Sequence, residues 1–136
     1  MSAPGAPWHD FAYAWIRAVP HVHLDTGATV GVVVHAPTAA YLGAHVIDDP
    51  AALRVLAPGI DQALLARALA MIDGIARGDA ACGALAALPA SERFHWLTAP
   101  RSAVVQPSAV HVGRTHDPAA TLDRLFALCR AQGGLE

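Results

Sequence analysis

The side chains best suited to binding or catalysis are concentrated between Ser91 and Asp117, in a chain that is otherwise apolar and rich in alanine. This stretch combines arginine, histidine, glutamine, serine and tryptophan, and Pro100 and Pro107 restrict the backbone between them. Packing alone does not require so many hydrogen-bonding groups close together. The stretch is therefore predicted to form the functional site.

Arginines in and near this stretch are suited to binding an anion. All nine basic side chains of the sequence are arginine, and the planar guanidinium group matches carboxylate or phosphate. Arg101 lies between Pro100 and Ser102, whose hydroxyl and amide could add hydrogen bonds. The structural alternative is that Arg101 pairs with a carboxylate or with loop carbonyls. The predicted ligand-binding residues are Arg17, Arg93, Trp96, Arg101, Ser102 and Gln106.

Two of these residues have an ordinary structural alternative. Arg17 follows Trp15 by two positions, so its guanidinium could simply stack on the indole ring. Trp96 lies between Phe94 and Leu97, a pattern that is also typical of a core position.

His111 and Ser108 are the candidate catalytic residues. His111 could act as a general acid or base, and Ser108 as a nucleophile or proton donor. Gln106 and Ser108 share one face of an extended segment, and His111 joins that face only if Pro107 or a bulge shifts the alternation. No G-x-S-x-G motif surrounds Ser108, so a buried hydrogen-bonding scaffold is the alternative.

His21, His23 and Asp25 form an H-x-H-x-D array that could hold a divalent metal if it lay on a strand. The array follows Pro20, where a turn is predicted, so an exposed turn is favoured over a metal site. No metal ligand and no cofactor is predicted.

Composition limits the classes of function. A 136-residue chain with 54% hydrophobic and 15% charged residues is typical of one folded domain. Its net charge of −2 and scattered arginines argue against nucleic-acid binding. No apolar run approaches the roughly 20 residues of a membrane helix, and no signal peptide is recognisable, so a cytoplasmic location is expected. Cys82 and Cys129 are not in a C-x-x-C pair and are expected to be packed thiols.

Hydrophobic periodicity predicts four strands. Large and small side chains alternate over Phe11–Val19, and Thr29–Ala36 is so continuously apolar that it is predicted to be buried on both faces. Gly31 within it indicates a bulge or a close backbone approach. Tyr41–Ile47 is the third strand, and Ser102–Val112 contains a fourth that is broken at its proline.

Helical signals alternate with these strands. A short helix is predicted over Ala51–Leu56 and a longer one over Asp61–Arg77, and Ser91 begins one or two helical turns. Asp117 and Pro118 begin the final helix. Residues 1–8 are expected to be a flexible leader, residues 9–132 a single α+β domain and residues 133–136 a flexible tail. The predicted fold class is α+β, an antiparallel sheet of about four strands with helices packed on one face.

Four sequence blocks carry a resemblance to a known family. They are Tyr13-Ala14-x-x-Arg17-x-Val19-Pro20, Gly31-Val32-Val33-Val34, Arg93-Phe94-x-Trp96-Leu97-Thr98-Ala99-Pro100-Arg101-Ser102 and Val105-Gln106-Pro107-Ser108-x-Val110-His111-x-Gly113. Together they resemble the bacterial domain-of-unknown-function family three-zero-three-seven, over roughly Phe11 to Arg130. The resemblance implies no settled activity. It implies a HipA-like kinase as a partner, because members are often encoded beside one.

The chain departs from this family between His23 and Gly31. Members typically carry Arg-Gly-Glu and an Asn there, and in this chain Asp25 or Thr29 would have to substitute for them.

Two hypotheses of function follow. The first is a non-catalytic accessory or binding domain that recognises an anionic ligand or a partner such as a HipA-like kinase. The second is a small hydrolase or transferase that uses His111 as acid or base and Arg101 to bind the anion of the substrate. A metalloprotein that depends on His23 is a third alternative.

Overall fold

The computed structural model describes residues 6–21, 26–100 and 104–135. The elements follow in the order β1 (His9–His21), β2 (Thr26–Ala36), η2 (Pro37–Ala39), β3 (Tyr41–Val46), α1 (Pro50–Leu56), α2 (Gln62–Arg77), η3 (Ala80–Cys82), η4 (Ala84–Ala87), α3 (Ala90–Leu97), β4 (Val105–Pro107), β5 (His111–Thr115) and α4 (Pro118–Gln132). The three η elements are short 3-10 helices.

The strands form one antiparallel sheet around β1. β2 pairs with one edge of β1, and β3 pairs with β2. β1 has 13 residues, so two short strands share its other edge: β5 pairs with His9–Tyr13, and β4 pairs with Ile16–Ala18. The predicted fourth strand is therefore two strands, because the chain leaves the sheet after Pro107 and rejoins it at His111.

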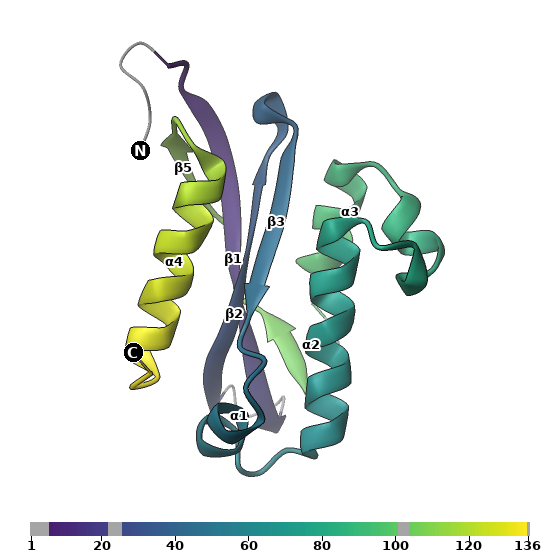
Figure 1. Ribbon diagram of the computed structural model, residues 1–136, viewed down its shortest axis with the longest axis vertical. Coiled ribbons are helices and arrows are strands. Elements are labelled where there is room, and N and C mark those ends of the chain that lie inside the picture. The colour runs from purple at the N-terminus through teal and green to yellow at the C-terminus, as the bar shows by residue number, and fades with distance from the viewer. Residues whose placement is uncertain (1–5, 22–25, 101–103, 136) are drawn as a thin grey trace.

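Helices cover both faces of this sheet, and α4 lies on the opposite side from α2 and α3 (Figure 1). Val33 and Ala14 pack into a cluster with Leu65 and Leu69 of α2. Val32 and Val34 point the other way and pack with Leu122 of α4. The α+β class and the antiparallel sheet are confirmed. The expectation that helices pack on one face is corrected, since the apolar residues of β2 point to both sides and each side needs a cover.

Gly31 has both features that the sequence indicates. The pairing of β1 with β2 shifts register beside it, where Ile16 faces Gly31 and Arg17 faces Thr29. A Cβ at Gly31 would also lie 2.8 Å from the carbonyl oxygen of His45 on β3. The glycine thus allows β3 to approach closely at an irregular point of the sheet.

The helix boundaries agree with the capping signals. Asp49, Asp61 and Asp117 each accept a hydrogen bond from a backbone amide in the first turn of α1, α2 and α4. Gly78 ends α2 in the left-handed conformation, with a φ of 73°. Among the described residues, none of the helices has both the length and the apolar character needed to cross a membrane.

Candidate ligand-binding cleft

Arg93, a predicted anion-binding residue, uses its guanidinium group within the fold. Its Nε donates to the carbonyl oxygen of Leu88 at 2.8 Å, and its Nη1 donates to the carbonyl oxygens of Ile75 and Ala76 at 3.0 and 2.8 Å. The latter two carbonyls belong to the last turn of α2, where helical hydrogen bonds run out. Arg93 therefore caps the C-terminus of α2.

Arg17 and Gln106 are brought together by the sheet. They face each other directly across the β1–β4 pair, so their side chains emerge on the same face. Arg17 Nη2 also donates to the carbonyl oxygen of Gly27 at 3.1 Å. Trp96 lies on the other side of the molecule in α3, where it is half-buried against the main core.

Ser108 holds the break between β4 and β5 against β1. Its hydroxyl accepts a hydrogen bond from the Trp15 amide at 2.9 Å and donates one to the carbonyl oxygen of Ala109 at 2.8 Å. The amide of Ser108 donates to the carbonyl oxygen of Trp15 at 2.8 Å. The hydroxyl proton is thus directed to a backbone oxygen, and Ser108 replaces strand pairing where the regular ladder is interrupted.

His111 is exposed at the start of β5. Its ring centroid lies 5.2 Å from that of Tyr13, the residue opposite it on β1. It shares the α4 side of the sheet with Arg17 and Gln106, whereas Arg93 lies on the side of α2 and α3. The structure therefore brings together only part of the predicted set.

Several predicted residues lie outside the described residues. Arg101 and Ser102 are among them, as are His23 and Asp25 of the H-x-H-x-D array, and only the backbone of His21 is described. Among the residues that are described, no group of three histidines, cysteines or carboxylates is placed to hold a metal ion.

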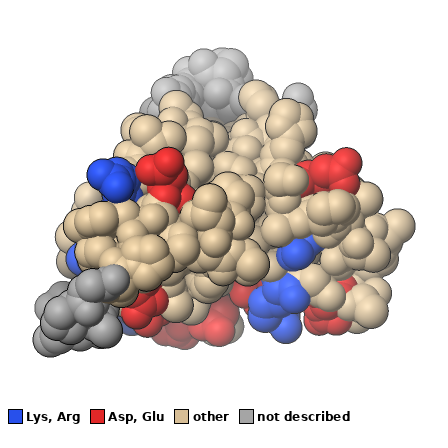
Figure 2. Space-filling view, turned by 90° about the horizontal axis from the view of Figure 1, so that it is seen from above, with Lys and Arg blue, Asp and Glu red and all other residues tan. Residues whose placement is uncertain are grey.

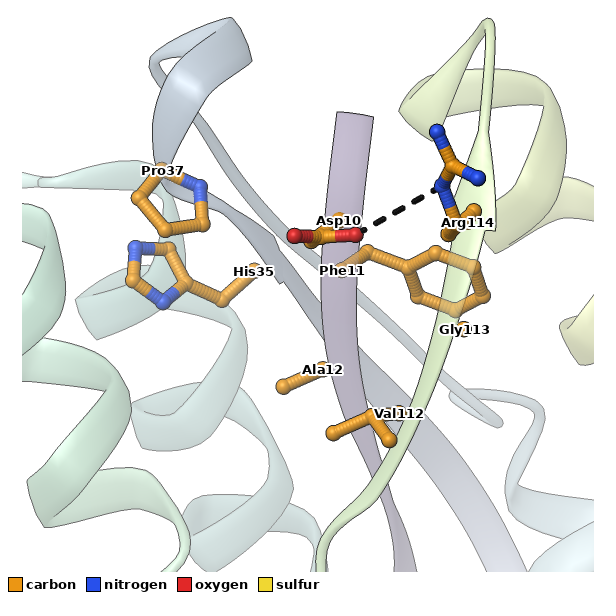
Figure 3. Close-up of a pocket in the computed structure, with 8 residues that line it drawn as sticks. All are labelled: Asp10, Phe11, Ala12, His35, Pro37, Val112, Gly113 and Arg114. Carbon is orange, nitrogen blue, oxygen red and sulfur yellow. Dashed lines mark ion pairs between the residues drawn. The ribbon is translucent and has the colours of Figure 1, made fainter. Parts of the chain in front are cut away.

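A cleft lies elsewhere, at the end of the sheet where β5 runs beside β1 (Figure 3). Its volume is about 500 Å³, which is within the range of small-ligand sites. Its lining residues are Asp10, Phe11, Ala12, His35, Pro37, Val112, Gly113 and Arg114. They come from β1, from the end of β2, from the start of η2 and from β5 (Figure 3).

Most of the cleft is apolar. Ala12 and Val112 face each other across the β1–β5 pair, and Val112 is 81% exposed. Phe11 is almost fully buried, and its ring lies beside Gly113, where a Cβ would come within 2.8 Å of the ring carbons. The glycine thus makes room for the aromatic ring beneath the cleft.

Arg114 provides a positive charge at the rim. Its Nε lies 3.7 Å from an Asp10 carboxylate oxygen, and its Cζ lies 5.4 Å from the centre of the Trp8 ring. Figure 3 shows the two terminal nitrogens pointing away from Asp10. Arg114 is thus held at two sides, while the forked end that binds carboxylate or phosphate remains directed outward.

His35 provides an imidazole at the other side of the cleft. It is 8% exposed, and its ring centroid lies 5.0 Å from that of Phe94 in α3. Burial lowers the pKa of His35, and the positive charge of Arg93 lowers it further. The ring is therefore neutral at pH 7 and adds no charge to the site.

None of the eight residues that line this cleft is among the named catalytic or ligand-binding candidates, although Val112, Gly113 and Arg114 lie in the predicted stretch from Ser91 to Asp117. The site depends on Asp10 facing Arg114 across two strands that are about a hundred residues apart in the chain. Nothing in a single sequence gives that register. The one available signal is Arg114 itself, which belongs to the polar stretch from Ser91 to Asp117.

Charged groups elsewhere are scattered. Figure 2 shows arginines and acidic residues distributed over a largely uncharged surface, without an extended basic patch on the face in view.

Comparison with known proteins assigns the chain to a family whose activity is not known. Residues 13–129 match the family described as Protein of unknown function (DUF3037). No curated protein and no solved structure matches the chain.

Proposed function

We propose that this chain, which belongs to the DUF3037 family of proteins of unknown function, is a non-catalytic binding domain. It recognises an anionic group in the cleft between β1 and β5. The observation that carries the proposal is the arrangement of Arg114 above an apolar surface that includes Ala12 and Val112. An apolar cleft with a few well-placed polar groups is the usual form of a ligand site.

The way Arg114 is held supports binding rather than a surface ion pair alone. Its Cζ lies 5.4 Å from the centre of the Trp8 ring and its Nε lies 3.7 Å from Asp10, and these two contacts favour an orientation of the exposed guanidinium group at the rim of the cleft. Charge-assisted hydrogen bonds from the forked end add to the attraction.

The hydrogen bonding of Ser108 supports a non-catalytic role. Its hydroxyl is engaged with the Trp15 amide and the Ala109 carbonyl, which leaves it poorly placed as a nucleophile. The enzyme hypothesis pairs His111 as acid or base with Arg101 as anion ligand, and Arg101 lies outside the described residues.

The partner that we propose to test first is a HipA-like kinase, which the family resemblance implies. Such a protein would present a carboxylate or phosphate to Arg114. Binding should then depend on the same arginine as binding of a small carboxylate does.

The test uses N-acetyl-leucine, which joins one carboxylate to one apolar side chain, and inorganic phosphate as a second probe. Calorimetry should show that Arg114→Ala weakens binding by about tenfold or more, the loss of one charge-assisted contact. Arg124→Ala is the matched control, because Arg124 is exposed on α4 on the other side of the sheet. Equal affinities of Arg114→Ala and the parent chain, with folding unchanged, would overturn the proposal.

A further inference from the structure

β5 is an outer strand of the sheet formed by the described residues. It pairs with β1 on one side, and no described strand pairs with its other side. In an antiparallel strand, every second residue directs its N–H and C=O away from its partner. β5 therefore offers backbone hydrogen bonds toward the outside of the sheet, directly beside the cleft.

Beside the charged Arg114 and the exposed His111, three of the exposed side chains near this edge are large and apolar. Val112 is 81% exposed, Val110 is 45% exposed and Trp8 is 55% exposed. Edge strands that only need to avoid pairing usually carry charges or proline. Three large apolar side chains around one short strand instead indicate a surface that another molecule covers.

The pairing inside the sheet shows which side chains β5 accepts. β1 places Asp10 opposite Arg114, Phe11 opposite Gly113 and Ala12 opposite Val112. A strand on the outer edge would meet the same β5 residues from the other side. An acidic side chain beside Arg114 and an apolar one beside Val112 would lie two positions apart, on the face that carries the cleft.

We infer that the ligand of this site is an extended segment of a partner protein, which adds to β5 as a further strand and carries an acidic and an apolar residue two positions apart. The inference rests on the proposed function and names the class of its ligand. Backbone hydrogen bonds to the β5 edge supply affinity, and the contacts with Arg114 and Val112 select the sequence.

Charge complementarity favours this partner over a second copy of the chain. If β5 paired with its own copy around Gly113, Arg114 would face Val112 of the partner strand. That pairing supplies no carboxylate to the outward end of Arg114. A partner segment with an acidic residue supplies it.

The test uses a synthetic peptide with the sequence of residues 9–14, HDFAYA, acetylated and amidated at its ends. This sequence already fits the inner edge of β5. Two further versions carry N-methyl groups on alternate backbone amides, one on the even and one on the odd positions. Only one set of amides can face β5, so calorimetry should show that one version loses at least about tenfold in affinity and the other binds like the parent.

Two side-chain changes complete the test. Replacing the peptide aspartate by asparagine should weaken binding to the native chain but not to Arg114→Ala, and Val112→Thr should weaken binding of every version. Val112 is exposed, so the fold should tolerate this change, and the melting temperature verifies it.

The outcomes separate the inference from the function on which it rests. Strand addition is overturned if both N-methylated peptides bind as tightly as the unmethylated peptide. It is also overturned if no peptide binds while N-acetyl-leucine binds through Arg114. In both cases the proposed function stands. If neither probe binds, both fail. A further outcome is that no peptide binds and the chain instead self-associates as its concentration rises, with the association lost in Val112→Lys. This result would overturn the inference and would indicate that a second copy of the chain pairs with β5.

Discussion

Single residues show why an arginine is hard to assign from sequence. The guanidinium group has five donors and binds carboxylates, phosphates and backbone carbonyls alike. Arg93 uses three hydrogen bonds on the carbonyls of Leu88, Ile75 and Ala76. Arg114, by contrast, contacts Asp10 only through Nε. Arg93 and Arg114 are the same residue type. They differ in whether backbone carbonyls lie close enough to use the donors that a ligand would need.

The capping role of Arg93 makes a prediction about stability. Arg93→Ala should lower the free energy of unfolding by about 2 to 3 kcal/mol, since the carbonyls at the end of α2 lose a charged donor. Urea unfolding followed by circular dichroism measures this. Arg67→Ala, at an exposed position of α2, should change the value little. If the two variants were equally stable, the capping role would be wrong.

The buried imidazole of His35 makes a prediction about pH. Its pKa is lowered in the folded chain, so as the pH falls below about 6.5 the unfolded chain takes up the proton first. The free energy of unfolding should therefore decrease from neutral toward acidic pH, until the pH has passed below the pKa in the folded chain. Removing the imidazole in His35→Gln should make this decrease smaller.

Urea unfolding at a series of pH values between 7.5 and 5, spanning roughly the histidine range, would measure the effect. His95→Gln, at an exposed position of α3, controls for the loss of a histidine. An identical pH dependence of His35→Gln and the parent chain would contradict the assignment.

Individual elements were largely predictable because their signals are local. Asp61 and Gly78 mark the two ends of α2, and Asp117 marks the start of α4, as the capping pattern indicates. The break at Pro107 was also recognisable. The sequence did not reveal that this break separates two strands on the same edge of β1, because strand pairing depends on residues far apart in the chain.

Ser108 at this break gives a prediction at the scale of the element. Ser108→Ala leaves the Trp15 amide without its acceptor and should reduce the free energy of unfolding by about 1 to 2 kcal/mol. Ser91→Ala, at an exposed position of α3, is the matched control and should be nearly neutral.

A role of Ser108 confined to catalysis would give the opposite pattern. Ser108→Ala would then unfold like the parent chain in urea. That result would return the serine to the list of candidate catalytic residues.

At the scale of the whole molecule, β2 explains both the success and the error of the fold prediction. The run from Thr29 to Ala36 predicts a strand buried on both faces, and Val32, Val33 and Val34 are indeed fully buried. A strand buried on both sides requires a cover on each side. The one-face arrangement was therefore inconsistent with this strand, and α4 supplies the second cover.

The cleft was not predictable because it belongs to no single element. Asp10 and Ala12 come from β1, and Val112 and Arg114 come from β5, so the site exists only once these strands pair. Local patterns identify elements and caps. They do not identify the side chains that long-range pairing brings together.

The closure of α4 over the sheet can be tested through Cys129. Its side chain is fully buried, and its Sγ lies 3.5 Å from the carbonyl oxygen of Thr29 on β2. Burial raises the pKa of this thiol to about 11, against the opposing effect of the Arg130 charge. In the Cys82→Ala variant, Cys129 is the single thiol. At pH 8 it should react with a thiol reagent at least about a hundredfold more slowly than in urea, because so little thiolate is present and access requires opening.

A destabilising change elsewhere should speed up this reaction only if α4 opens together with the rest of the domain. Val112→Thr on β5 is expected to leave the rate unchanged, whereas Arg93→Ala, which loosens the opposite face, should raise it in proportion to its loss of stability. Rapid labelling of the native chain, with its circular dichroism intact, would mean that α4 separates from β2 on its own. The two faces of the sheet would then not form one cooperative unit.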